Sequence, residues 1–185
     1  IYPVRNPNPI VTSYPAALNE EAFYGLPGDI VRAIEPHTES DIAALLIQLL
    51  VVFGNIIGRN SYYQVEAGRH YPNIFAVLVG RTSKGRKGTS FGHIQRLFEQ
   101  IEMDYRPADG LSSGEGLIWA VRDSILKSVP VKVGGKSTGE YEEIKVDEGV
   151  LDKRFLTVEG EFAALLKLMN REGNTLSPVI RNAWD

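Results

Sequence analysis

Hydrophobic and polar residues follow two different spacings along this chain, and together they predict a mixed α/β protein. Apolar positions three and four residues apart predict helices, whereas short apolar stretches rich in β-branched and aromatic residues predict strands. The predicted helices cover 28–37, 42–58, 89–103, 112–126, 161–173 and 174–185. The predicted strands cover 61–68, 73–80, 129–133, 140–146 and 155–158.

The segment 73–80, NIFAVLVG, is a continuous apolar run. Such a run is typical of a strand that is buried on both faces, as in a parallel sheet. A second short buried strand is predicted at 155–158, and a hairpin with a flexible tip is predicted at about 129–147. We therefore expect a mainly parallel sheet with a hairpin insertion.

The helix predicted at 42–58 is apolar on nearly every side, which favours a helix packed inside the protein. Thr38 or Ser40 is its expected N-cap, and Gly58 is its expected end. A membrane span is the alternative, but the run is at the lower length limit for spanning and contains Gln48. No membrane is therefore expected.

Composition divides the chain into three regions. Residues 1–27 are rich in Pro, Asn and Tyr, which predicts an extended arm or linker. Residues 28–72 form a helical lead-in, and residues 73–185 form the α/β core with its hairpin. The chain starts at Ile1 and ends directly after a helical pattern, so we expect it to be an excerpt of a longer protein.

Charge and cysteine content narrow the function classes. A formal net charge of -3 argues against a wholly basic nucleic-acid binder. The absence of cysteine excludes disulfides and thiolate sites, and it is compatible with the expected location in the cytoplasm. His37, His70 and His93 are scattered without the spacing of metal ligands.

Two stretches compete as a phosphate-binding loop. The P-loop pattern G-x-x-x-x-G-K-[ST] joins a buried strand to a helix, whose first amides bind the phosphates. The stretch GGKST, 134–138, contains the literal Gly-Lys-Ser, but Pro130 stands where the first glycine belongs and a strand follows. It is therefore interpreted as a hairpin turn.

The loop after the segment 73–80 has the right context, although its spelling differs from the pattern. Gly80 and Gly85 have the required spacing, but Arg86 and Lys87 follow them instead of Lys and Ser/Thr. A solvated basic turn is the alternative interpretation. The candidate nucleotide-binding residues are Gly80, Lys84, Gly85, Arg86, Lys87, Gly88, Thr89 and Ser90.

One inserted residue, Gly88, separates Lys87 from the hydroxyl of Thr89. Lys87 and Lys84 are therefore both candidates for the lysine that reaches the terminal phosphates. Thr89 or Ser90 supplies the hydroxyl expected on Mg²⁺, with Thr89 as the named candidate.

A nucleotide site also needs an acid for Mg²⁺ and the attacking water, usually at the end of a neighbouring strand. Glu159 directly follows the strand predicted at 155–158, and Glu161 is two residues further on. Both are candidate catalytic residues, and Glu159 is also a candidate metal ligand. The alternative for Glu159 is a carboxylate that caps the following helix.

Three stretches that contain these candidates resemble one family of proteins. The stretches YGLPGDIVRAIEPHTESD, VLVGRTSKGRKGTS and LTVEGEFAALLKLMNREGNTLSPVIRNAWD are similar to the DUF3987 group of RecA-like P-loop proteins, from about Phe23 onward. The resemblance implies a RecA-like core preceded by a helical segment. It makes the loop 80–90 the Walker A equivalent and Glu159 or Glu161 the Walker B acid.

The group is helicase-like and often occurs beside or fused to primase-polymerase modules of mobile elements. The resemblance implies a nucleotide-binding, ATP-hydrolysing domain that acts on DNA during replication of a mobile element or phage, with ATP or another NTP and Mg²⁺ as cofactors. A primase-polymerase partner and a homo-oligomer are compatible with it.

RecA-like cores continue beyond the Walker B acid, yet only residues 160–185 follow Glu159, so the core is expected to be incomplete at the C-terminus. Arg181 is interpreted as a surface helix arginine, with a contact to nucleotide or to a neighbouring subunit as the alternative.

A second function from another class is a non-catalytic nucleic-acid-binding module whose basic loop contacts backbone phosphates. Aromatic residues interleaved with basic ones would support it, and Tyr62, Tyr63 and Phe91 are the candidates. Their simpler interpretation, favoured here, is that they belong to the core.

Overall fold

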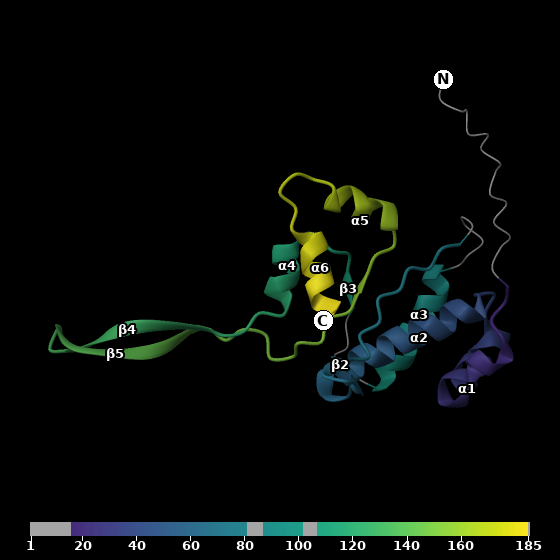
Figure 1. Cartoon of the computed structure of the whole chain (residues 1–185), viewed down its shortest axis with the longest axis horizontal. Helices are drawn as coiled ribbons and strands as arrows, with labels where there is room; N and C mark the ends of the chain where they lie inside the picture. The colour runs from purple at the N-terminus through teal and green to yellow at the C-terminus, as the bar shows by residue number, and fades with distance from the viewer. Residues whose placement is uncertain (1–15, 81–86, 102–106, 185) are drawn as a thin grey trace, which may run out of the picture.

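The computed structural model describes residues 16–80, 87–101 and 107–184, with the backbone alone for Lys87 (Figure 1). The protein is a mixture of helix and strand, 47% and 20% respectively. Its described strands form three two-stranded sheets, two antiparallel and one parallel. The expected mixture of helix and strand is thus confirmed, whereas the expected mainly parallel sheet is not found among the described residues, where one of the three small sheets is parallel.

Three helices build the hydrophobic core: α1 (Gly25–Ile34), α2 (Ile42–Ile57) and α3 (Lys87–Ile101). Short 3₁₀ turns, η1 (Glu20–Phe23), η2 (Glu35–His37) and η3 (Gly58–Asn60), flank α1 and α2. The core side chains come from η1 and from all three helices. They are Phe23, Val31, Leu45, Leu46, Leu49, Val52, Ile94 and Phe98.

Capping residues set the limits of α2. The N-cap is Asp41, whose Oδ1 accepts a hydrogen bond of 2.8 Å from the amide of Ala43. The prediction of Thr38 or Ser40 as N-cap was therefore wrong; the hydroxyl of Thr38 instead donates to Ser40 across 2.9 Å. Gly58 ends the helix at a positive φ of 64°, as expected.

Helix α2 together with η3 is, among the described residues, the one stretch long and apolar enough to cross a membrane. A third of its most apolar window is buried inside the protein. The helix packs against α1 and α3 and contributes Leu45, Leu49 and Val52 to the core.

A small hairpin follows α2. Strands β1 (Tyr63–Val65) and β2 (Gly68–His70) pair antiparallel, with Tyr63 opposite His70. Sequence predicted one strand over 61–68, but the chain reverses at Glu66, which takes a positive φ of 50°. Two short strands thus replace the one predicted.

The segment 73–80 differs from its prediction. It is not a strand in the described structure, and its apolar side chains are accessible, with Val77 and Val79 57% and 87% exposed. A strand needs a neighbour to satisfy its amides and carbonyls and a layer to cover each face. Within the described ranges no strand pairs with this segment and only its start contacts a helix, through Phe75 and Trp184, so most of its apolar side chains stay exposed.

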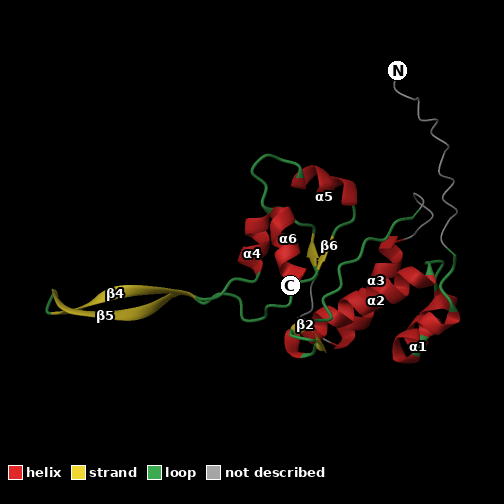
Figure 2. Cartoon of the chain, viewed as in Figure 1, coloured by secondary structure: helices red, strands yellow, loops and turns green. Residues whose placement is uncertain are grey.

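The C-terminal region contains the parallel sheet. Strands β3 (Ala108–Asp109) and β6 (Thr157–Val158) pair in parallel, so the strand predicted at 155–158 is reduced to its last two residues. Helices α4 (Gly114–Ala120) and α6 (Leu176–Trp184) pack side by side, and α5 (Phe162–Met169) follows β6 (Figure 2). The helix predicted at 112–126 is shorter in the structure: α4 covers Gly114–Ala120.

Strands β4 (Ile125–Val133) and β5 (Lys136–Asp147) form a long hairpin, which we call the arm and which extends away from the helices (Figure 1). Gly134 and Gly135 form its tip with positive φ angles of 60° and 83°. Two such residues suit the tight turn of a two-residue hairpin loop. The stretch GGKST is thus a hairpin tip, as the sequence predicted.

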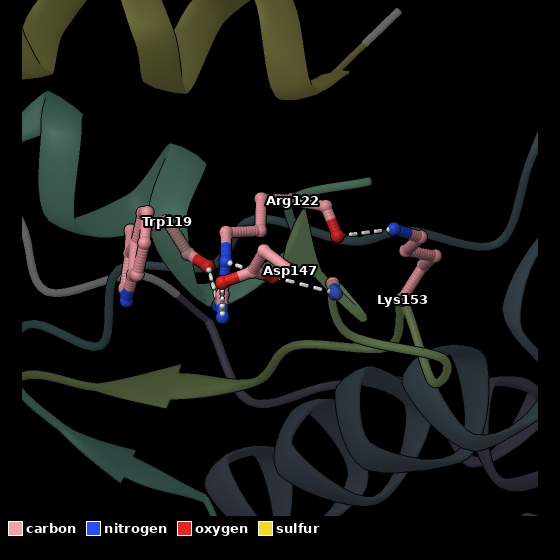
Figure 3. A network of polar contacts seen from close by, with 5 residues as sticks. Trp119, Arg122, Asp147 and Lys153 are labelled. Atoms are coloured by element: carbon pink, nitrogen blue, oxygen red, sulfur yellow. Dashed lines mark hydrogen bonds and ion pairs between the residues drawn. The ribbon is translucent and has the colours of Figure 1, made fainter. Parts of the chain in front are cut away.

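A polar network fixes the base of the arm (Figure 3). Arg122 Nε and Nη2 donate to the two carboxylate oxygens of Asp147 across 3.1 and 3.0 Å. The same guanidinium lies 3.7 Å from the ring centre of Trp119, and Lys153 Nζ donates to the carbonyl of Arg122 across 2.6 Å. The hydrogen bond from Arg122 and that from the amide of Gly149 lower the pKa of Asp147. We call this group the arm clamp.

Candidate phosphate-binding site

The candidate loop lies mostly outside the described residues. Lys84, Gly85 and Arg86 fall there, and of Lys87 only the backbone, the first residue of α3, is described. Gly80 is described and half-buried, at the end of the segment 73–80. The structure therefore places a helix start directly after the loop, two residues before the predicted start at Thr89.

The first turn of α3 presents its two hydroxyls differently. Thr89 is exposed, whereas Ser90 is fully buried and contributes to the interior of the helical core. Gly88 borders open space, because a side chain there would meet no atom within 4 Å. Of the two candidate hydroxyls, Thr89 is thus the one that a ligand can reach in this structure.

A shallow hollow of about 230 Å³ lies along the accessible side of α3. Thr89, Gly92, His93 and Arg96 line it, at the i, i+3, i+4 and i+7 positions of one helix face. It holds one permanent cation, Arg96, two helical turns from the N-terminus of the helix. Sequence reasoning missed Arg96, although its helical spacing from Thr89 could have identified it.

Glu159 has a local partner. Its Oε1 accepts a hydrogen bond of 3.0 Å from the amide of Glu161, the residue before α5. Its Oε2 approaches Gly110 so closely that a methyl group added at this glycine would lie 3.2 Å from the oxygen. The Glu159 carboxylate thus binds the amide of the residue that precedes α5, and no side chain caps the helix itself; Glu161 is exposed.

Within the described residues, Thr89 and Glu159 do not line a common hollow. Helix α3 lies along α2, whereas β6 pairs with β3 and leads into α5 (Figure 2); Leu156, directly before β6, packs against the helical core. Of the residues that the structure describes, those lining the hollow beside Thr89 all belong to α3. Because the segment 73–80 does not pair with β6, the two strand ends that would bring hydroxyl and acid together do not share a sheet edge.

Metal-ligating side chains do not gather elsewhere in the described part of the chain. No group of three or more His, Asp or Glu side chains there has the geometry to hold a metal ion. Thr89 and Glu159 thus remain the candidate metal ligands on sequence grounds.

Arg181 is an exposed residue of α6, as the simpler interpretation predicted. It borders a hollow of about 330 Å³ with Phe75, Ile180 and Trp184. The rings of Phe75 and Trp184 meet edge to face at 5.1 Å, and Asn73 donates to the carbonyl of Trp184 across 2.9 Å. These two contacts connect α6 to the start of the segment 73–80.

The aromatic candidates divide between core and surface. Phe91 is half-buried and packs on the helical core, as expected. Tyr62 and Tyr63 are 47% and 74% exposed, so their interpretation as core residues was wrong. They lie at and beside β1, whose residues are all accessible.

Comparison of the chain with protein-family models, with curated proteins and with solved structures finds no match in any of the three.

Proposed function

We propose that this chain is a nucleotide-binding, ATP-hydrolysing domain of the helicase-like kind, with a RecA-like core related to the DUF3987 group. One observation carries the proposal: α3 starts directly after the glycine-rich basic loop, with Thr89 exposed in its first turn. A helix N-terminus concentrates unpaired amides and a partial positive charge, which favours phosphate. The loop adds Arg81, Lys84, Arg86 and Lys87 to that field.

Each candidate residue has a role in the proposal. Lys84 or Lys87 neutralises the terminal phosphates of ATP, and Thr89 provides a hydroxyl for Mg²⁺. Glu159 or Glu161 orients metal and water once β6 and the segment 73–80 lie in one sheet. The domain would act in DNA replication of a mobile element or phage, in the cytoplasm. It would do so together with a primase-polymerase partner and as a homo-oligomer.

The test is binding of Mg-ATP by isothermal titration calorimetry to the unmodified chain, Lys84→Ala, Lys87→Ala and Lys136→Ala. Lys136 is the matched control because it belongs to the literal GGKST on the arm tip. A hydrogen bond to a charged group contributes about 1.5–3 kcal/mol, so loss of the working lysine should weaken binding by about 10- to 100-fold. Equal affinities of all four proteins, or a loss confined to Lys136→Ala, would sink the assignment.

Hydrolysis is tested separately with Glu159→Gln and Glu161→Gln. The variant that removes the working acid should keep its affinity for Mg-ATP and lose phosphate release at least tenfold. Unaltered release from both single variants and from the double variant would contradict the assigned role of these acids.

The second candidate function, a non-catalytic nucleic-acid-binding module, is favoured by the accessibility of Tyr62 and Tyr63. It predicts salt-sensitive DNA binding that the loop variants weaken, without any stabilisation of the fold by Mg-ATP. Thermal unfolding with and without Mg-ATP distinguishes the two functions.

A further inference from the structure

Two arginines and two tyrosines at and beside the β1–β2 hairpin contact one another in a row, which we call the Arg-Tyr ladder. The guanidinium carbon of Arg59 lies 4.0 Å from the ring centre of Tyr71. Tyr71 meets Tyr62 edge to face at 5.9 Å, and the guanidinium carbon of Arg69 lies 4.7 Å from the ring centre of Tyr62. Charged planes and aromatic rings are thus in contact through four side chains.

The ladder belongs to one face of the hairpin. Gln64 is opposite Arg69 in the register, and side chains alternate between the faces of a strand. Tyr62, Arg69 and Tyr71 therefore share a face, while Tyr63 points to the other one. The two tyrosines, adjacent in sequence and both accessible, are thus in different surroundings.

The ladder stands on a fixed support. Gly54 of α2 lies so close to the carbonyl of Pro72 that an added methyl group would overlap it, 1.9 Å away. The amide of the Gln64 side chain donates to the carbonyl of Glu66 across 2.7 Å and closes the turn. The chain after β2 thus packs on α2 and the turn is closed by a hydrogen bond, which favours a ladder that is preorganised before binding.

The stretch of sequence that carries the ladder is locally basic, although the chain as a whole has a net charge of -3. The stretch 58–73 carries Arg59 and Arg69 with His70, against the single acid Glu66. Exposed rings next to guanidinium groups stack with nucleobases and pair with phosphates, a combination typical of surfaces for single-stranded nucleic acid.

We propose that the Arg-Tyr ladder is a binding site for single-stranded nucleic acid, in which unpaired bases stack on Tyr62 and on the guanidinium planes while Arg59 and Arg69 face phosphates. The site is separate from the nucleotide loop and does not require nucleotide. It therefore holds whether or not the chain binds ATP.

The test uses the full chain without nucleotide and a fluorescein-labelled oligothymidylate of about 20 nucleotides, followed by fluorescence anisotropy at low salt. Tyr62→Ala and Arg69→Ala should each weaken binding about tenfold or more, because stacking on one ring is lost in the first and a cation in the second. Tyr63→Ala is the matched control and should leave the affinity within about twofold. Tyr62→Phe keeps the ring and should bind like the unmodified chain.

Three outcomes would overturn the proposal: no binding of the oligonucleotide, equal weakening by Tyr62→Ala and Tyr63→Ala, or weakening by Lys84→Ala and Lys87→Ala alone. The last would assign the nucleic acid to the basic loop, and the first would point to a protein partner. Far-ultraviolet circular dichroism of each variant verifies the fold. Loss of Mg-ATP binding in the loop variants with the oligonucleotide affinity retained would separate this site from the nucleotide site.

Discussion

Arg122 links two elements at the scale of a single residue, because its guanidinium contacts Asp147 of β5 and the ring of Trp119 of α4 at once. Asp147 has a lowered pKa for this reason. Its ionised form is thus favoured by the folded state, and the stabilisation is present above the ordinary Asp pKa of about 3.9. It is lost as the pH falls below about 4 and through the folded pKa.

Substitution Arg122→Ala should raise the pKa of Asp147 toward the ordinary value, because the main donor to its carboxylate is lost. The measurement is the carboxyl carbon chemical shift of Asp147 as a function of pH. Arg122→Lys is the control: it keeps the charge but not the two parallel hydrogen bonds, so the midpoint should fall between those of the other two proteins. An identical midpoint in Arg122→Ala and the unmodified chain would contradict the arm clamp.

Gly54 and Gly92 are both helical glycines with opposite surroundings. A methyl group at Gly54 would overlap the carbonyl of Pro72, whereas one at Gly92 would meet no atom within 4 Å. Gly54→Ala should lower the free energy of unfolding by about 1–3 kcal/mol or more, because α2 must move away from the chain beneath β2. Gly92→Ala should raise it by about 0.5–1 kcal/mol.

Urea unfolding followed by circular dichroism measures both changes. The contrast between the two glycines is decisive, since both variants alter helix propensity in the same way. Equal effects of the two substitutions would mean that α2 and Pro72 do not touch as described.

At the scale of elements, the sequence predicted an element correctly where its hydrogen bonds are formed between residues close together in the chain, as in a helix or a hairpin. The apolar spacing of α3 places Ile94 and Phe98 in the core, and two glycines at the arm tip allow a hairpin that pairs with itself. The segment 73–80 has an equally strong signal but depends on neighbours distant in the sequence. An apolar run indicates that the segment tends to be buried. It does not show that a partner strand is available to pair with it.

The candidate site follows the same division. Thr89 could be placed at a helix start because the helix is local, and its accessibility agrees with a ligand role. The meeting of Thr89 with Glu159 depends on a sheet that joins distant segments, and it stays a prediction. The Arg-Tyr ladder could not be anticipated, because Arg59 and Tyr71 meet only through the reversal of the chain at Glu66.

The arm contributes little to its own stability. Beyond its base, it contributes nothing to the stability of the rest of the protein. A two-stranded ribbon exposed on both faces is marginal by itself, and nearly all residues of β4 and β5 are exposed. Replacing residues 128–143 by Asn-Gly, which keeps Lys127 opposite Ile144 and the arm clamp intact, should change the free energy of unfolding by less than about 0.5 kcal/mol. Urea titration measures it, and a loss of several kcal/mol would show that the arm packs on the body.

At the scale of the whole molecule, the surface is larger than that of a compact protein. The chain exposes 14547 Å², where a compact monomer of 20.5 kDa exposes about 8,800 Å². The arm and the segment 73–80 contribute to the excess, and many of their exposed side chains are apolar, among them Tyr141, Ile144, Phe75 and Val79.

Small-angle X-ray scattering should therefore give a radius of gyration well above the value of about 16 Å for a compact chain of this length. The variant without residues 128–143 should give a clearly smaller radius at nearly the same mass. A radius near 16 Å for the unmodified chain would contradict the extended arm and mean that the apolar segment folds against the body.

Because the arm is long and is fixed at its base by the arm clamp, a small rotation at the base displaces its tip. With nine residues in β4, the tip stands about 30 Å from the fulcrum at Arg122 and Asp147. A rotation of about 5° at the fulcrum would move the tip by roughly 3 Å over such a length. At the base of the arm, α4 is linked to the residue before α6, because the hydroxyl of Thr175 donates a hydrogen bond of 2.7 Å to the carboxylate of Glu115. The base of the arm is thus connected through α4 to α6, whose Trp184 carbonyl accepts a hydrogen bond from Asn73 at the start of the segment 73–80.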